Sequence, residues 1–275
     1  MGSSIPRAFA RLCGYLLVTL PLMPVQAVLL AVGSSWARRL PMFYHRSICR
    51  VLGIEVEVHG TMSAAHPTLF VCNHISYFDI EVLGSTILGS FVAKREVAGW
   101  PLFGWLARLQ RTVFVERRTT GVADERDELA RRLDEGDSLI LFAEGTSSDG
   151  NRLKPFKSSL LSVAERPVHG RPLIVQPVSV AYTRLDGMPI GRQWRPYFAW
   201  YGSMELASHL WTAVGLGRLT VALIFHPTLT IADAGSRKAL AVSCQAVIGR
   251  GLEAANSGRM AALTAPASGA PAAAE

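Results

Sequence analysis

The sequence is poor in charged residues, and its first 54 positions contain no acidic residue at all. Charged residues make up 18% of the 275 positions and hydrophobic residues 49%, whereas a soluble domain carries about 25% charged residues. This balance excludes a disordered or acidic solvating chain. It predicts a globular body with an unusually apolar part, and the length suffices for a large packed core.

Paired cysteines and the common hydrolase and zinc motifs are also missing. The four cysteines are isolated, without a C-x-x-C pair, so we expect neither a zinc site nor a disulfide framework, and a reducing compartment is favoured. The chain contains no G-x-S-x-G and no H-E-x-x-H. These absences argue against a serine hydrolase with a nucleophile elbow and against a zinc enzyme. We therefore expect no metal.

The basic residues are concentrated at the amino terminus. Residues 1–54 contain six arginines, and the first carboxylate is Glu55. The remaining chain is nearly neutral although the formal net charge is +7. Cations that flank an apolar segment favour an anionic membrane surface. Nucleic acid would require a basic stripe across the folded body, so we do not expect it as a partner.

The segment from Leu12 to Ala37 is uncharged and lies between arginine pairs. About 20 apolar residues suffice to cross a membrane. Pro21 and Pro24 are expected to interrupt the helix and leave two halves that are each too short to cross. One kinked spanning helix, a two-helix hairpin in one leaflet and a signal peptide cleaved near Ala27 are the alternatives. The apolar stretch continues beyond that cleavage site, which favours membrane attachment through residues 1–50.

Beyond residue 50, short apolar runs alternate with helical stretches. This order predicts an α/β fold, with a mixed, largely parallel sheet flanked by helices, over residues 51–255. Residues 256–275 are rich in Ala and Pro and are expected to form a disordered tail. The expected strands are Ile54–His59, Thr68–Cys72, Ser90–Lys94, Thr112–Val115, Ser138–Phe142, Leu173–Tyr182 and Arg218–Phe225. The expected helices are Asp79–Ile87, Gly121–Glu135, Ser158–Glu165, Met204–Val214 and Ser236–Ala255.

A polar motif, N-H-I-S-Y-F-D, directly follows the expected buried strand Thr68–Cys72. His74 stands five residues before Asp79, so its ring can turn back toward that carboxylate. The carboxylate would fix the imidazole tautomer and leave the other ring nitrogen free as a general base. The alternative is that Asn73 and Asp79 only cap the next helix.

A second polar motif, F-A-E-G-T-S-S-D-G, follows the expected strand Ser138–Phe142. Gly, Ser and Thr at the carboxyl end of a strand form a tight loop whose amides can face a ligand. Ligands of open α/β sheets bind outside the carboxyl ends of the strands, so the two motifs are expected to open onto one crevice. The alternative is a simple polar turn.

Together the two motifs resemble those of the glycerolipid acyltransferase family, typified by bacterial 1-acylglycerol-3-phosphate acyltransferase. The family's N-H-x4-D block matches residues 73–79, and its F-P-E-G-T-R block resembles residues 142–147. Two further blocks complete the resemblance, which spans residues 68–182 in the right order. They are found at Lys94, Pro101, Phe103-Gly104 and Phe114 to Arg117, and at the apolar Pro-containing run Val175 to Val180.

The resemblance implies acyl transfer from a thioester, on coenzyme A or acyl-carrier protein, to the hydroxyl of a membrane lysolipid, without a cofactor. It implies that His74 takes the hydroxyl proton and that Asp79 orients His74. It also implies a membrane-associated enzyme at the cytoplasmic face of the inner membrane. The residues that it places at the substrate are Asn73, Lys94, Arg117, Glu144, Gly145, Thr146 and Ser147.

Position 147 departs from the family pattern, because Ser stands where the family usually has Arg. Arg offers a permanently charged fork for a phosphate that Ser cannot imitate, although Arg152 lies near in sequence. The run from Glu144 to Ser158 also resembles bacterial enzymes that acylate lyso-ornithine lipid, which has no phosphate. Lysophosphatidate and lyso-ornithine lipid both remain candidate acceptors. A membrane-associated lipid hydrolase and a non-catalytic lipid-binding protein are the alternatives from other functional classes.

Overall fold

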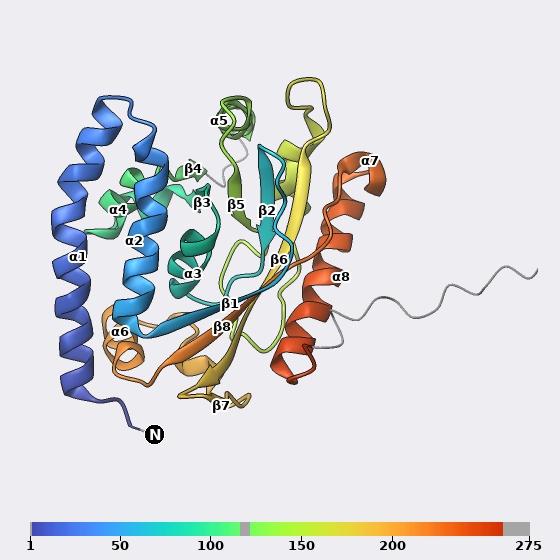
Figure 1. The fold of residues 1–275 in the computed structure, drawn as a ribbon. Coiled ribbons are helices and arrows are strands. Elements are labelled where there is room, and N and C mark those ends of the chain that lie inside the picture. Colours follow the sequence, from blue (N-terminus) through green and yellow to red (C-terminus); the bar gives the residue numbers. More distant parts are fainter. Residues whose placement is uncertain (1, 116–121, 261–275) are drawn as a thin grey trace, which may run out of the picture.

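A central sheet with helices on both faces forms the body of the protein (Figure 1). The computed structural model describes residues 2–115 and 122–260. The strand order is β1-β8-β6-β2-β5-β3-β4, and the short β7 pairs with β6. The strands are β1 (Ile54–Gly60), β2 (Thr68–Cys72), β3 (Ser90–Lys94), β4 (Val113–Val115), β5 (Leu139–Phe142), β6 (Ile174–Leu185), β7 (Met188–Pro189) and β8 (Leu219–Phe225).

Most strand pairs are parallel, as the alternation of strands and helices predicted. β1 pairs with β8, β2 with both β5 and β6, and β3 with both β4 and β5, all in parallel. Among the strands of the described residues, only the pairs that β6 makes with β7 and β8 are antiparallel. The mixed, largely parallel sheet is therefore confirmed. The carboxyl ends of β2, β3 and β5 lie at one edge of the sheet, because these strands run in the same direction.

The central strands are buried on both faces, and their side chains alternate between two cores. In β2, Phe70 and Cys72 belong to one apolar cluster, whereas Leu69 and Val71 belong to the other. Successive side chains of a strand point to opposite faces, so a continuous apolar run fills both cores. Helix α3 (Phe78–Thr86) packs in the first core, and α5 (Val122–Asp134) and α8 (Arg237–Asn256) pack in the second.

Shorter helices connect these elements. The expected helix over Ser158–Glu165 is a 3-10 helix, η2, with the same bounds. Asn256, which we expected to begin the disordered tail, is instead the last residue of α8, and residues 261–275 of that tail lie outside the described residues. The other connecting helices are η1 (Arg95–Gly99), α4 (Phe103–Leu109), η3 (Arg195–Tyr197), α6 (Leu206–Val214) and α7 (Ile231–Ala234).

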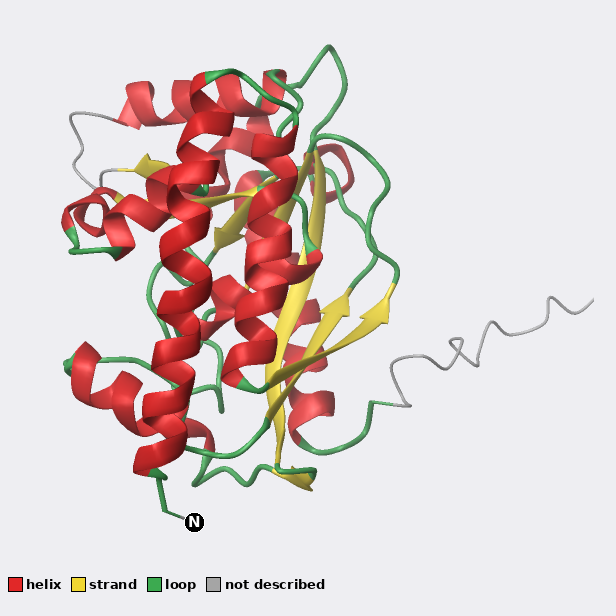
Figure 2. Cartoon of the chain, turned by 60° about the vertical axis from the view of Figure 1, so that its left-hand side comes forward, coloured by secondary structure: helices red, strands yellow, loops and turns green. Residues whose placement is uncertain are grey.

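The amino-terminal segment forms two antiparallel helices, α1 (Ile5–Ala31) and α2 (Trp36–Leu52), that stand against the body (Figure 2). The expected break at Pro21 and Pro24 is wrong, because α1 continues through both prolines and the chain turns only after Ala31. A proline removes one helical hydrogen bond, but packing beyond the prolines holds this helix together. The Gln26 side chain donates to the carbonyl oxygens of Ala37 and Leu109, at 2.9 Å each.

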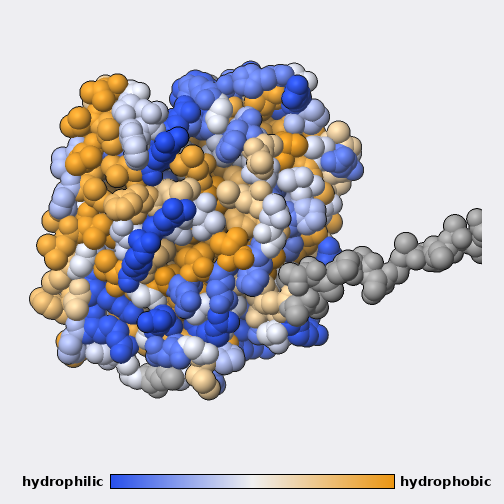
Figure 3. All heavy atoms as spheres, in the orientation of Figure 1, coloured by the Kyte–Doolittle hydropathy of each residue, from blue (hydrophilic) through white to orange (hydrophobic). Residues whose placement is uncertain are grey.

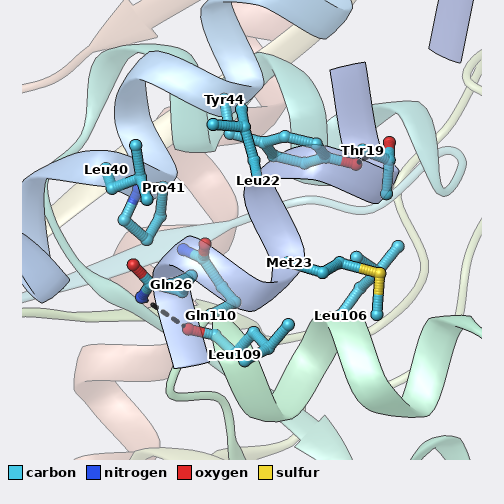
Figure 4. A pocket seen from close by; sticks show the side chains of 10 residues that line it. All are labelled: Thr19, Leu22, Met23, Gln26, Leu40, Pro41, Tyr44, Leu106, Leu109 and Gln110. Atoms are coloured by element: carbon cyan, nitrogen blue, oxygen red, sulfur yellow. Dashed lines mark hydrogen bonds between the residues drawn. The ribbon is translucent and has the colours of Figure 1, made fainter. Parts of the chain in front are cut away.

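Both ends of α1 are attached to the body. Near its start, Ala8 is fully buried in the first core, and the Arg11 guanidinium donates to the carbonyl oxygens of Val214, Leu216 and Gly217 at the end of α6 and just after it. Near its end, Gln26 lies beside a small apolar pocket that α1 forms with α2 and α4 (Figure 4). The helix therefore lies along the body instead of projecting from it.

The opposite side of α1 is apolar and exposed. Its most apolar 18-residue stretch has a mean hydropathy of 1.8, and only 11% of that stretch is buried. By length and composition the helix could cross a membrane. Figure 3 shows apolar side chains gathered over this side of the molecule. The large exposed side chains of α1 are Ile5, Phe9, Leu16, Leu17, Leu20, Val25 and Val28.

Candidate active site

The site begins where the buried strand β2 ends. The chain leaves the sheet after Cys72, and α3 begins at Phe78, so the five residues 73–77 form a tight loop. The ring of His74 turns back toward α3, and its Nδ1 lies 2.8 Å from Oδ2 of Asp79. Asp79 is fully buried, whereas 21% of the His74 side chain is exposed. The predicted pairing of His74 with Asp79 is present.

Asp79 also fixes the loop that carries His74. Its Oδ2 accepts hydrogen bonds from the backbone amides of Ile75, at 2.6 Å, and Ser76, at 3.0 Å. The carboxylate thus binds the imidazole and closes the turn before α3. It does not cap the helix, because the first turn of α3 has no side-chain capping hydrogen bond at its N-cap residue Tyr77.

Asn73 supports the same loop from below. Its side-chain amide donates to the Val180 carbonyl oxygen, and its Oδ1 accepts from the Val180 amide, at 2.9 and 2.8 Å. The residue is completely buried. Our prediction that Asn73 contacts substrate is therefore corrected, because both polar groups of its side chain are used to join the loop to β6.

The second motif lies directly against the first. Glu144 follows β5, and its Oε1 accepts the backbone amide of His74 at 2.8 Å, while its Oε2 accepts the amide of Lys154 at 2.7 Å. Burial raises the pKa of the Glu144 carboxyl from 4.5 to about 7, although the two amides oppose this effect. The Ser148 amide completes the contact by donating to the His74 carbonyl oxygen at 2.8 Å.

Ser147 is occupied by a structural contact. Its hydroxyl donates to the carbonyl oxygen of Trp200, whose own amide donates to the Ile75 carbonyl oxygen at 3.0 Å. Only 7% of Ser147 is exposed. The residue that replaces the family's Arg thus joins the segment around Trp200 to the loop of His74.

The remaining predicted substrate residues are spread along the edge of the sheet. Gly145 adopts a left-handed φ of 65°, which suits Gly in this turn. Thr146 is exposed beside it. Lys94 ends β3 and is partly exposed at the same edge. Arg117 lies outside the described residues.

The arrangement leaves one ring nitrogen of His74 available. Phe142 stacks on the ring with centroids 4.0 Å apart, while Nδ1 is held by Asp79. No described residue forms a hydrogen bond with Nε2. A His held by a carboxylate at one nitrogen and open at the other can accept a proton from a hydroxyl. Within the described part of the chain, no group of three His, Cys, Asp or Glu side chains could hold a metal ion.

Two residues that no sequence motif marked also reach the site, Tyr182 from a distant strand and Lys154 from the loop after β5. Tyr182 of β6 donates its hydroxyl to Oδ1 of Asp79 at 2.7 Å, across 103 positions of sequence. The Lys154 ammonium donates to the Ser147 carbonyl oxygen at 2.7 Å. Nothing local in the sequence marks Tyr182, since it ends an apolar run that serves equally well as a core strand.

Comparison with known proteins shows the family of the chain. A family model named Acyltransferase matches residues 55–181. Over 239 residues the chain is 41% identical to a lyso-ornithine lipid O-acyltransferase of Brucella abortus (strain 2308), covering 86% of this chain and 90% of the relative. The chain belongs to the acyltransferase family. This membership favours a transferase over the hydrolase and the binding protein that the sequence left as alternatives.

Further acyltransferases resemble the chain. A lyso-ornithine lipid O-acyltransferase of Rhizobium meliloti (strain 1021) is 44% identical, covering 82% of this chain and 80% of the relative. A 1-acyl-sn-glycerol-3-phosphate acyltransferase of Neisseria meningitidis is 29% identical over 71% of this chain and 73% of its own. The crystal structure of the 1-acyl-sn-glycerophosphate acyltransferase from Thermotoga maritima shares the fold, with a TM-score of 0.59, 23% identity and coverage of 78% of each chain.

Proposed function

We propose that this acyltransferase moves a fatty acyl group from a thioester to the hydroxyl of a lysolipid, with lyso-ornithine lipid as the preferred acceptor. His74 removes the hydroxyl proton through Nε2 while the oxygen attacks the thioester carbonyl carbon. The carbon–sulfur bond then breaks, and the departing thiolate takes the proton from His74. The thiolate of a thiol with a pKa of about 8.5 is a good leaving group, so a strong acid is not required.

The observation that carries this proposal is the partly exposed His74 ring, bonded to buried Asp79 through Nδ1 and open at Nε2. The carboxylate stabilises the imidazolium that forms when the hydroxyl proton arrives. Phe142 covers one side of the ring. Because the Nε2 lone pair lies in the plane of the ring, this stacking leaves it accessible to a hydroxyl.

The choice of acceptor rests on Ser147 and on the names of the similar proteins. A phosphate monoester requires charged donors in a partly dry site. At position 147 a neutral hydroxyl is already bonded to the Trp200 carbonyl oxygen. Two relatives above 40% identity are named for lyso-ornithine lipid, whereas the relative named for a glycerol phosphate is 29% identical. These observations favour a headgroup without a phosphate.

The test measures acylation of lyso-ornithine lipid and of lysophosphatidate by the purified protein in mixed micelles, with labelled acyl-coenzyme A and with acyl-carrier protein. We expect a larger kcat/KM for lyso-ornithine lipid. Ser147→Arg should shift the ratio of the two values toward lysophosphatidate, and Ser147→Ala is the matched control that breaks the Trp200 contact without adding charge. Exclusive use of lysophosphatidate by the wild type would refute the acceptor assignment.

The attachment of α1 supports a hairpin that lies in one leaflet. The 27-residue helix is about 40 Å long. Because Arg11 ties its start to the body and Gln26 ties its end, a spanning α1 would draw the polar body into the bilayer. Buried and intermediate free cysteines suit a reducing compartment. Both points support attachment to the cytoplasmic face of the inner membrane, where acyl thioesters are available.

Flotation with anionic phosphatidylglycerol vesicles tests this attachment. The double variant Phe9→Glu with Leu17→Glu changes two of the most exposed α1 side chains, which are 64% and 75% exposed. It should leave the vesicle fraction while remaining folded. Val242→Glu is the matched control, since Val242 is 69% exposed on α8, on the opposite side of the sheet from α1 (Figure 1). Equal flotation of all three proteins would contradict attachment through α1.

A further inference from the structure

Tyr182 lies beneath the catalytic loop, on the part of β6 that extends past the end of β2. The last residue of β2, Cys72, is paired with Val178, so Val180 and Tyr182 continue under the loop. Val180 holds Asn73 through its backbone, and Tyr182 is fully buried, with its ring edge-on to Phe198 at 6.4 Å.

The hydrogen bonds of Asp79 are divided unequally between its two oxygens. Oδ2 accepts from His74, Ile75 and Ser76, all within one turn of chain. Among the described residues, Oδ1 accepts from Tyr182 alone, at 2.7 Å. A buried carboxylate oxygen without a donor costs free energy. The bond from Tyr182 therefore also fixes the rotation of the Asp79 carboxylate about its Cβ–Cγ bond.

We propose that Tyr182 is a positioning residue, which holds the Asp79 carboxylate, and through it the ring of His74, in the orientation that proton transfer requires. The proposal rests on the acyl transfer proposed above. Tyr182 touches no substrate, because it is completely buried behind Asp79. Burial and the neighbouring Asp79 charge raise the pKa of the Tyr182 phenol well above its ordinary value, so the hydroxyl remains a donor at every working pH.

Tyr182→Phe removes the donor and keeps the ring. Without that hydrogen bond the negative charge of Asp79 is less stabilised, and the carboxylate holds the proton on His74 more firmly. We expect the acidic limb of the kcat/KM profile to move to higher pH by about half a unit or more. We expect kcat at the plateau to fall about tenfold with little change in KM, because the lost bond acts on proton transfer and not on binding.

The influence of other titratable groups near His74 and Asp79 has to be separated from the effect of Tyr182→Phe on the acidic limb. Glu144 faces His74 from the β5 loop, Cys72 lies behind Asp79 on β2, and Tyr77 is the other phenol of the loop. Burial raises the pKa of Glu144 to about 7, so the Tyr182→Phe profile is also measured in a Glu144→Gln background, where the shift of the acidic limb should persist. Tyr77→Phe is the matched control. Its hydroxyl bonds to His209 at 2.9 Å and not to Asp79, so the acidic limb should stay in place.

A double-mutant cycle with Asp79→Asn completes the test. If Tyr182 acts through Asp79, Tyr182→Phe should have almost no further effect on kcat once the carboxylate is gone. An unchanged acidic limb in Tyr182→Phe, or an undiminished loss in the Asp79→Asn background, would overturn the proposal. A wild type that transfers no acyl group to any lysolipid would refute the proposed function instead, so the two failures are distinguishable.

Discussion

Two histidine–carboxylate pairs of this molecule have similar geometry and different surroundings. In one, His74 Nδ1 lies 2.8 Å from Asp79, and in the other, His45 Nδ1 lies 2.7 Å from Glu81. Both carboxylates belong to α3, two residues apart. The pairs differ in the second ring nitrogen, which is open in His74 but lies 3.0 Å from the Gln110 Oε1 atom in His45.

The surroundings of His45 show what the second pair does. Its side chain is only 4% exposed, and it joins α2 to α3. Gly84 of α3 allows the ring to approach closely, because a Cβ at that position would lie 2.4 Å from His45 Cδ2. The pair of His45 and Glu81 therefore holds the amino-terminal hairpin against the body. A histidine–carboxylate bond does not by itself make a base, since the base also needs an open nitrogen at the surface.

The largest expected effect comes from His74→Ala. We expect kcat to fall by about 10²–10⁴, the usual contribution of general-base catalysis. The melting temperature should change little, because the ring is partly exposed and Asp79 keeps its two amide donors and Tyr182. A rate near that of the wild type would remove His74 from the mechanism.

Asp79→Asn should have the next largest effect on activity. The amide cannot stabilise the imidazolium and disturbs the tautomer of His74. The side-chain amide of the variant would also point its N–H groups at donors that now bond to an Asp79 oxygen, so stability should fall as well. Steady-state kinetics and thermal melts measure the two losses separately. A loss of stability with an unchanged kcat would show that Asp79 serves only the loop.

His45→Leu should reduce stability and leave activity nearly unchanged, which is the reverse of the effect expected for His74→Ala. It leaves the largely buried Glu81 carboxylate, whose side chain is 15% exposed, without its partner. Breaking a fully buried pair costs about 3–5 kcal/mol of unfolding free energy, so we expect a somewhat smaller loss here. The kcat per folded molecule should remain close to that of the wild type. Urea unfolding with activity measured on the folded fraction checks both statements.

The double variant His45→Leu with Glu81→Leu sharpens the contrast. Replacing both members of a buried pair by apolar side chains is often close to neutral, so much of the lost stability should return. No corresponding double variant of His74 and Asp79 should recover activity. If kcat fell with His45→Leu as far as with His74→Ala, the distinction between the two pairs would fail.

The smallest expected effect concerns the pH dependence of stability at Glu144. Its carboxyl pKa is about 7 in the folded protein and 4.5 ordinarily, so between these values the folded state binds more protons than the unfolded state. The unfolding free energy should therefore fall as the pH rises from about 4.5 to 7, through this group. Glu144→Gln should flatten that slope in urea unfolding measured across the range. If the unfolding free energy of the variant fell equally steeply with pH, the slope would belong to another titratable group.

Much of the fold follows from local patterns in the sequence. β2 and β3 have the predicted bounds, because their apolar runs are short and end at polar residues. η1 and α4 were not predicted, since the segment around Pro101 combines Gly, Pro and Trp without a clear helical period. The break predicted in α1 was wrong because local rules for proline ignore the hydrogen bonds that Gln26 makes to Ala37 and Leu109.

The sequence by itself determined the pair of His74 and Asp79, because five residues of loop suffice to bring the two side chains together. It also determined the apolar α1 and the alternation of strands and helices, which depend on neighbours along the chain. Only the tertiary structure decided that Asn73 is buried and that Ser147 bonds to the Trp200 carbonyl oxygen. It also decided that His45 is paired with Glu81 and that the Tyr182 hydroxyl donates to Asp79. Each of these contacts joins segments far apart in sequence, and the packing of the sheet and its helices, which no local pattern encodes, sets their distances.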